Sequence, residues 1–134
     1  MMKRNVSRLW IGISGVSGAF AVAMGAFGAH GLRAVLPLQA MAIYETAVEY
    51  HFWHSLALLG CGVLMAVWPE RARGLSWAAA GFVAGIVLFS GSLYGLSMSD
   101  QRWLGAVTPV GGLCWIAAWL TVAWVALRDY SSTK

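Results

Sequence analysis

The sequence predicts an all-α fold, an integral membrane four-helix bundle with both chain ends in the cytoplasm. Of the 134 residues, 60% are hydrophobic and 10% are charged, and the mean hydropathy is +0.70, above the range of water-soluble domains. Four apolar stretches approach the ~20 residues that cross a hydrocarbon core ~30 Å thick. Because these stretches are continuous rather than alternating, they exclude a transmembrane β-barrel. A chain of this length fits one domain, residues 1–134.

The first span, residues 9–29, follows a basic N-terminal segment and contains no charged residue. Small residues near its end, at 25–29, allow a secretory signal as an alternative. The apolar core of a signal peptide covers only ~7–15 residues, which is shorter than this stretch. We therefore interpret the segment as a membrane anchor.

The second span, residues 48–67, is the inner part of a longer predicted helix. Pro37 suits the first turn of a helix, and Trp68-Pro69-Glu70-Arg71 follows the last apolar residue. A helix from Pro37 to Trp68 is ~48 Å long at 1.5 Å per residue, which exceeds the hydrocarbon core. We therefore expect helix two to extend on the outer side of the membrane.

The third and fourth spans cover residues 76–96 and 105–127. Ser76 is of a residue type that caps helix N-termini, so the third span is expected to begin there. Polar residues from Ser97 to Asp100 end the third span, and Arg128-Asp129 ends the fourth.

The positive charges alternate between the segments that these spans separate. The N-terminal segment, the middle connection and the C-terminal segment share seven Lys and Arg, and the other two connections have one each. Cytoplasmic segments carry such an excess, so both termini are expected in the cytoplasm. The seven residues are Lys3, Arg4, Arg8, Arg71, Arg73, Arg128 and Lys134, and the other two are Arg33 and Arg102.

Small residues predict where the helices approach one another, because helices in lipid gain little from apolar burial. The first span has a small residue at every fourth position, and the third has two Gly-x-x-x-Gly steps. These positions are Ser17, Ala21, Gly25 and Ala29, then Gly81, Gly85, Gly91 and Gly95. The two cysteines, Cys61 and Cys114, lack a CxxC spacing, and we expect them to be reduced.

Polar residues from all four spans are expected to meet at the outer end of the bundle. Measured back from Trp68, Glu49 lies ~28 Å along the helix and His54 lies ~7 Å deeper. Glu45 and Glu49 share one helix face, and His51 and His54 lie roughly opposite. This outer polar cluster is the candidate ligand-binding site: His30, Glu45, Glu49, His51, His54, Ser90, Tyr94 and Thr108.

The glutamates and the histidines of this cluster each allow more than one interpretation. Glu45 and Glu49 either pair with Arg33 or Arg102 at the interface or relay protons or cations, since ionisable groups within spans are often functional. The histidines either form hydrogen bonds between helices, or bind a metal with His30 as a third ligand, or hold haem between His30 and His51 or His54. No catalytic triad, phosphate loop or zinc-protease pattern is visible, so no enzyme is expected.

Four motifs in order resemble a family of small bacterial inner-membrane proteins, the YgdD-like family, catalogued as domain of unknown function 423. The resemblance covers nearly the whole chain, and it implies a four-helix integral protein of the bacterial plasma membrane without implying an activity. The motifs are Gly25-Ala26-Phe27-Gly28-Ala29-His30-Gly31-Leu32, Tyr44-Glu45-Thr46-Ala47-Val48-Glu49-Tyr50-His51-Phe52-Trp53-His54-Ser55-Leu56-Ala57, Leu88-Phe89-Ser90-Gly91-Ser92-Leu93-Tyr94 and Thr108-Pro109-Val110-Gly111-Gly112.

Three hypotheses of function follow. The first is a non-enzymatic membrane protein whose outer polar cluster binds a lipid, a small ligand or a partner subunit, including a second copy of the chain. The second is a transporter-like or proton-relaying protein that uses Glu45, Glu49 and the histidines, and the third is a carrier of haem or metal. For the first hypothesis we expect no cofactor and no nucleic-acid partner.

Overall fold

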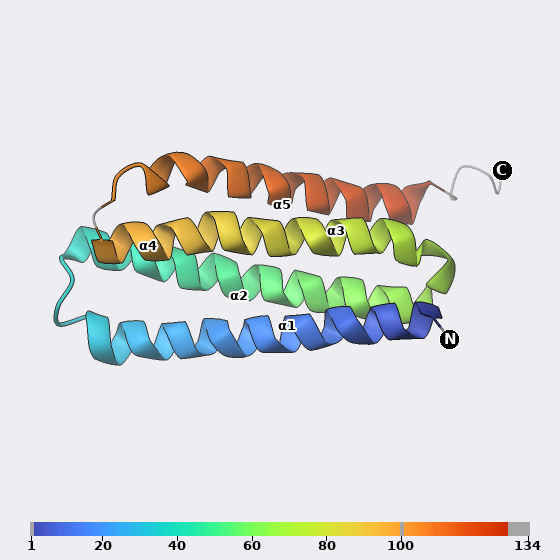
Figure 1. The fold of residues 1–134 in the computed structure, drawn as a ribbon, viewed down its shortest axis with the longest axis horizontal. Helices are drawn as coiled ribbons and strands as arrows, with labels where there is room; N and C mark the ends of the chain where they lie inside the picture. Colours follow the sequence, from blue (N-terminus) through green and yellow to red (C-terminus); the bar gives the residue numbers. More distant parts are fainter. Residues whose placement is uncertain (1, 100, 129–134) are drawn as a thin grey trace.

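The structure, a computed structural model, describes residues 2–99 and 101–128, and these residues form helices and turns without a strand. Four helical spans in this part of the chain are long and apolar enough to cross a membrane. They are Asn5–Leu32, Leu38–Val67, Pro69–Ser99 and Leu104–Leu127. The spans run side by side and alternate in direction, so that the two chain ends lie at one end of the bundle (Figure 1). The predicted all-α architecture with four helices long and apolar enough to span a membrane is confirmed for the described residues.

The spans are not uniformly α-helical. The first joins α1 (Met2–Phe27) to a π-helical turn, Gly28–Leu32. The second is a single helix, α2 (Leu38–Val67), which begins directly after Pro37 as predicted. The third consists of a 3-10 turn (Pro69–Arg71), α3 (Ala72–Gly85), a π-helical segment (Ile86–Ser90) and α4 (Gly91–Ser99), and the fourth is α5 (Leu104–Leu127).

The predicted start of the third span at Ser76 is wrong. Pro69 suits a first turn and opens a 3-10 turn almost directly after α2, so α3 begins earlier, at Ala72. Ser76 lies one turn inside α3, where its hydroxyl accepts a hydrogen bond from the Trp10 indole at 3.3 Å. Asp100 and Asp129, which were expected to mark helix ends, lie outside the described residues.

Two apolar clusters form the interior, and buried polar residues separate them along α2. One cluster contains Met41, Tyr44 and Ala47 from the first turns of α2, together with Tyr94. The other contains α2 residues from Leu58 to Met65 with buried residues of α3 and α5. Between them on α2 lie His51, His54 and Ser55, all buried. The interior therefore changes from apolar to polar and back within one helix.

Glycines allow the closest helix contacts, as the small-residue pattern predicts for the third span. A Cβ added to Gly85 would overlap the ring of Trp115 on α5. At Gly62 on α2, a Cβ would lie 2.7 Å from Ile11 Cγ1 and 3.1 Å from the Ile11 backbone nitrogen on α1. In the first span, Ala21 is buried and a Cβ at Gly25 would lie 3.3 Å from Val48, whereas Ala29 is exposed. α1 packs along α2 and only weakly against α3.

Candidate functional site

His51 joins three of the four spans through hydrogen bonds. Its ring is 3% exposed, with Nε2 3.1 Å from the Ser17 hydroxyl on α1 and Nδ1 3.3 Å from the Tyr94 hydroxyl on α4. Ser17 in turn lies 2.6 Å from the Ser55 hydroxyl on α2. Ser17 and His51 lie close to the midpoints of their helices, and we call Ser17, His51, Ser55 and Tyr94 the His51 network.

The His51 network has one consistent arrangement of hydrogens. Ser55 donates its only hydrogen to the His51 carbonyl at 2.9 Å, so Ser17 must donate to the Ser55 oxygen. The Ser17 oxygen then accepts from His51 Nε2–H, which leaves Nδ1 to accept from the Tyr94 hydroxyl. Every polar hydrogen is used, and the spare lone pairs on the Ser17 and Tyr94 oxygens can accept a further hydrogen bond.

A groove beside α1 meets this network from the surface. It has a volume of 880 Å³ and runs between α1 and the third span, from Arg8 at one end to Phe20 and Tyr94 at the other. We call it the α1 groove, and it is lined by Arg8, Leu9, Gly12, Ile13, Val16, Ser17, Phe20, His51, Val83, Ile86, Val87, Gly91 and Tyr94. Its wall residues Val16 and Val87 are 73% and 63% exposed, so the groove opens on the side of the bundle.

The α1 groove exists because small residues line both of its walls. A Cβ on Gly12 would meet no atom within 4 Å, and one on Gly91 would meet only the Ile86 carbonyl oxygen, at 3.9 Å. The π-helical segment, Ile86–Ser90, supplies part of the second wall. Segments of this kind often occur at functional sites.

His54 lies apart from the His51 network and packs against α5. Its Nδ1 donates to the Tyr50 carbonyl at 2.7 Å, and its ring stacks on Trp115 with centroids 3.6 Å apart and planes 3° apart. Trp115 is fixed in turn, since its indole donates to the Phe82 carbonyl at 3.1 Å. Aromatic rings therefore fill the space between α2 and α5, where His54 is a packing residue.

The charged members of the predicted cluster and His30 lie on the surface, in the half of the bundle opposite the termini. Arg33 donates to Glu45 at 3.1 Å, and both side chains are more than half exposed. Glu49 is exposed and accepts a hydrogen bond from the Trp53 indole at 3.5 Å. His30 is also exposed, and its Nδ1 bonds the Ala26 carbonyl within its own helix. None of these contacts reaches His51 or His54.

The remaining predicted residues connect the third span to its neighbours or are enclosed by them. The Thr108 hydroxyl lies 2.8 Å from that of Ser92, which links α5 to α4. The Ser90 hydroxyl is fully buried and has no hydrogen-bond partner among the described protein atoms. Within the described residues, no three His, Cys, Asp or Glu side chains are grouped so that they could hold a metal ion.

The eight predicted residues thus divide into separate places. His51 and Tyr94 belong to one network, and Glu45, Glu49 and His30 lie on the surface. Ser17, Ser55 and Ser92 were missing from the predicted site. The sequence gives only a weak signal that these serines belong to a site, since a serine within an apolar span can equally be a small residue at a helix contact.

Comparisons with known proteins agree on one family. The family model described as "Protein of unknown function (DUF423)" matches residues 24–112. The UPF0382 membrane protein YwdK of Bacillus subtilis is 38% identical, over 90% of this chain and 98% of its own length. The UPF0382 membrane protein SH2409 of Staphylococcus haemolyticus is 41% identical, over 84% of this chain and 90% of its own length. The UPF0382 inner membrane protein YgdD of Escherichia coli is 38% identical, over 91% of this chain and 92% of its own length. No solved structure matches the chain.

Proposed function

The chain belongs to the DUF423 family of proteins of unknown function, and we propose that it binds a membrane lipid with an anionic head group in the α1 groove. Its four apolar spans and the names of its relatives make it a multi-pass membrane protein and fit the inner membrane. The observation that carries the proposal is an open groove of 880 Å³ that ends on a buried hydrogen-bond network.

The size and lining of the groove favour a lipid over a partner helix. Its volume lies in the range of ~300–1,000 Å³ that small-molecule sites occupy. A helical segment as long as the stretch from Arg8 to Phe20, with a diameter of ~10–12 Å, would occupy roughly 1,400–2,000 Å³. Most of the lining is apolar, including Leu9, Ile13 and Val16, and such a surface suits an acyl chain.

Polar groups at the two ends of the groove would orient the lipid. Arg8 is exposed, and within the described part of the chain its guanidinium has no hydrogen-bond or ion-pair partner. A guanidinium binds a carboxylate or phosphate group well. Farther along the groove, the Ser17 and Tyr94 oxygens offer acceptors to a hydroxyl or N–H group of the ligand.

We also propose that Arg8 lies on the cytoplasmic side. Within the described residues, the end of the bundle near the termini carries Arg8, Arg71, Arg73 and Arg128, whereas the opposite end carries Arg33 and Arg102. The excess of positive charge favours the cytoplasm for the first end. The lipid head group would then come from the cytoplasmic leaflet.

The proposal assigns no reaction to this site. In the His51 network each nitrogen of the ring has a hydroxyl partner, so no free base faces the groove. General acid-base catalysis needs a titratable group within hydrogen-bond reach of the reacting proton. The network therefore supports binding and orientation of a ligand rather than proton abstraction.

Filling the groove tests the proposal. The probe is a diazirine-labelled fatty acid in liposomes that contain the purified protein, and labelled peptides are identified by mass spectrometry. Gly12→Phe places a ring in the groove, whereas Gly15→Phe adds the same ring at an exposed position outside it, and neither Cβ would meet an atom within 4 Å. We expect photolabelling of the groove residues in wild type and Gly15→Phe, and at least a fivefold reduction in Gly12→Phe. Equal labelling of all three proteins, or labelling spread evenly over the lipid-facing surface, would overturn the proposal.

A further inference from the structure

A second pocket lies between the start of the third span and the end of α5. It has a volume of 310 Å³ and is separate from the α1 groove, with which it shares no residue. Three arginines and one glutamate contribute to it, so its charge is positive. Its lining residues are Glu70, Arg71, Arg73, Gly74, Trp77, Trp124, Val125 and Arg128.

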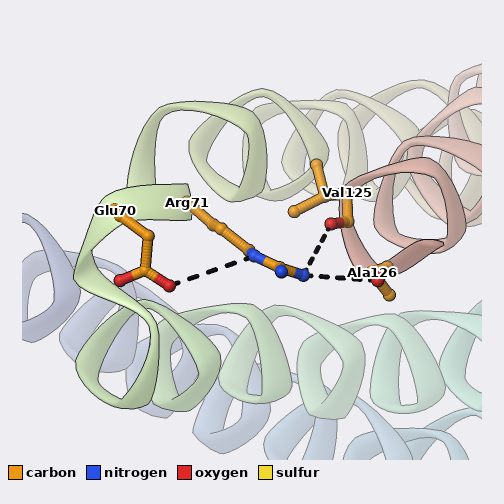
Figure 2. A network of polar contacts seen from close by, with 4 residues as sticks. All are labelled: Glu70, Arg71, Val125 and Ala126. Carbon is orange, nitrogen blue, oxygen red and sulfur yellow. Dashed lines mark hydrogen bonds and ion pairs between the residues drawn. The ribbon is translucent and has the colours of Figure 1, made fainter. Parts of the chain in front are cut away.

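Arg71 is held in place by the end of α5 (Figure 2). Its Nη1 donates to the Val125 carbonyl at 2.9 Å and to the Ala126 carbonyl at 3.3 Å, and its Nε lies 4.0 Å from a Glu70 carboxylate oxygen. The last carbonyls of a helix carry a partial negative charge and lack partners within the helix. Arg71 therefore joins α5 to the third span, and its position fixes the pocket.

Arg73 and Arg128 are the two exposed arginines at this pocket. Both side chains are exposed, and the Arg128 guanidinium lies 5.4 Å from the centre of the Trp124 ring. Glu70 is the one acidic residue among the lining residues, and it lies beside Arg71. The lining therefore has two positive charges more than it has negative ones.

The position of the pocket places it at the level of lipid head groups. It lies at the end of the bundle that carries both termini (Figure 1). Trp77 and Trp124 in its wall are 70% and 60% exposed, and exposed indoles near span ends prefer the membrane interface. Basic pockets between helices at this level suit phosphate groups of lipids.

We propose that this pocket binds the phosphate of an anionic phospholipid through Arg73 and Arg128, next to the fixed Arg71. Guanidinium groups match phosphate oxygens in two-point hydrogen bonds. The site is independent of the α1 groove, because it lies on other helices and has its own charged residues. It would bind its ligand whether or not the groove holds a lipid.

Native mass spectrometry of delipidated protein in mild detergent tests the site. The probes are phosphatidylglycerol, phosphatidylcholine with the same acyl chains, and soluble glycerol phosphate. All proteins carry Gly12→Phe, so that binding in the α1 groove does not contribute. The test variant is Arg73→Gln with Arg128→Gln, and the control is Arg33→Gln with Arg102→Gln, which removes the same charge at the opposite end.

We expect the protein to bind one phosphatidylglycerol in preference to phosphatidylcholine. Each arginine near a membrane surface contributes about fivefold in affinity, so the test variant, which lacks two, should bind about thirtyfold more weakly. The control should bind as the parent protein does. Equal weakening in test and control, or no preference for phosphatidylglycerol, would overturn the site. Glycerol phosphate that binds as tightly as the lipid would assign the pocket to free phosphate and overturn the lipid as its ligand.

Discussion

Replacing Gly85 with alanine tests whether the contact between Trp115 and His54 holds α5 in the bundle. A Cβ at Gly85 would overlap three atoms of the Trp115 ring, Cδ1, Nε1 and Cε2. The ring is 3% exposed and is held by the Phe82 carbonyl on one side and by His54 on another. Trp115 therefore cannot move away without losing these contacts.

The expected loss follows from the contacts that Trp115 would give up. A hydrogen bond between helices in a membrane contributes about 0.6 kcal/mol on average, and a stacked aromatic pair contributes about 0.5–1.5 kcal/mol. Their sum, about 1–2 kcal/mol, agrees with the cost of about 1–3 kcal/mol for overpacking a core. Gly85→Ala should lower the free energy of unfolding by about this amount, compared with a control that has the same gain in helix propensity.

Gly15→Ala is that control, because a Cβ at Gly15 would meet no atom within 4 Å. Both variants gain the helix propensity of alanine, about 1 kcal/mol, so this term cancels in the comparison. The free energy of unfolding is measured by titration with sodium dodecyl sulfate in mixed micelles, followed by circular dichroism. If the two variants unfold at the same detergent fraction, the assignment of Trp115 and His54 as a rigid packing unit is refuted.

Two further predictions concern the surface glutamates and the orientation of the chain. Glu49→Gln should leave proton flux into liposomes unchanged, because Glu49 is exposed and accepts a hydrogen bond from Trp53 rather than from the His51 network; a lower flux in the variant would favour a proton relay. A cysteine at Gln39 should react with a membrane-impermeant thiol reagent outside intact cells, and a cysteine at Arg73 should not, since both positions are exposed and lie at opposite ends of the bundle. The reverse labelling would place the termini outside.

The sequence is informative about the spans because length and hydropathy are properties of single segments. The apolar stretches and the charges between them predict four helices, and Pro37 predicts where α2 begins. The start of α3 was missed because the 3-10 turn that begins at Pro69 and the first residues of α3 are partly polar. A span defined by hydropathy alone leaves such residues out. The π-helical segments, Gly28–Leu32 and Ile86–Ser90, have no sequence signal of their own.

The candidate site was harder to predict because depth along a helix does not reveal which neighbour a side chain faces. His51 and His54 are three residues apart, which separates them by about 60° around the helix axis. That angle is enough for His51 to reach Ser17 and Tyr94 and for His54 to stack on Trp115 of α5. Glu45 and Glu49 lie at similar depths but face outward, so a group defined by depth alone combined residues that never meet.

The two sides of α2 show why the α1 groove is a better candidate than the packed aromatic side. Between α2 and α5, the rings of Tyr50, Phe82 and Trp115 fill the space around His54. Beside α1, a Cβ on Gly12 would meet no atom within 4 Å, so this side of the bundle is not filled by side chains. This space opens on the side of the bundle, where Val16 and Val87 are exposed.

In a membrane that space is filled by lipid, so the presence of a chain in the groove is expected for any amphiphile. Specific binding requires groups that distinguish one lipid from another, and apolar walls such as Val16 and Val87 cannot do so. Arg8 can select an anionic head group, and the acceptors on Ser17 and Tyr94 can select a hydrogen-bond donor farther along the chain. Arg8 is exposed and belongs to neither apolar cluster, so Arg8→Gln should change which lipid is retained without changing the fold. A retained lipid of the same kind in Arg8→Gln would mean that the groove selects its ligand by shape alone.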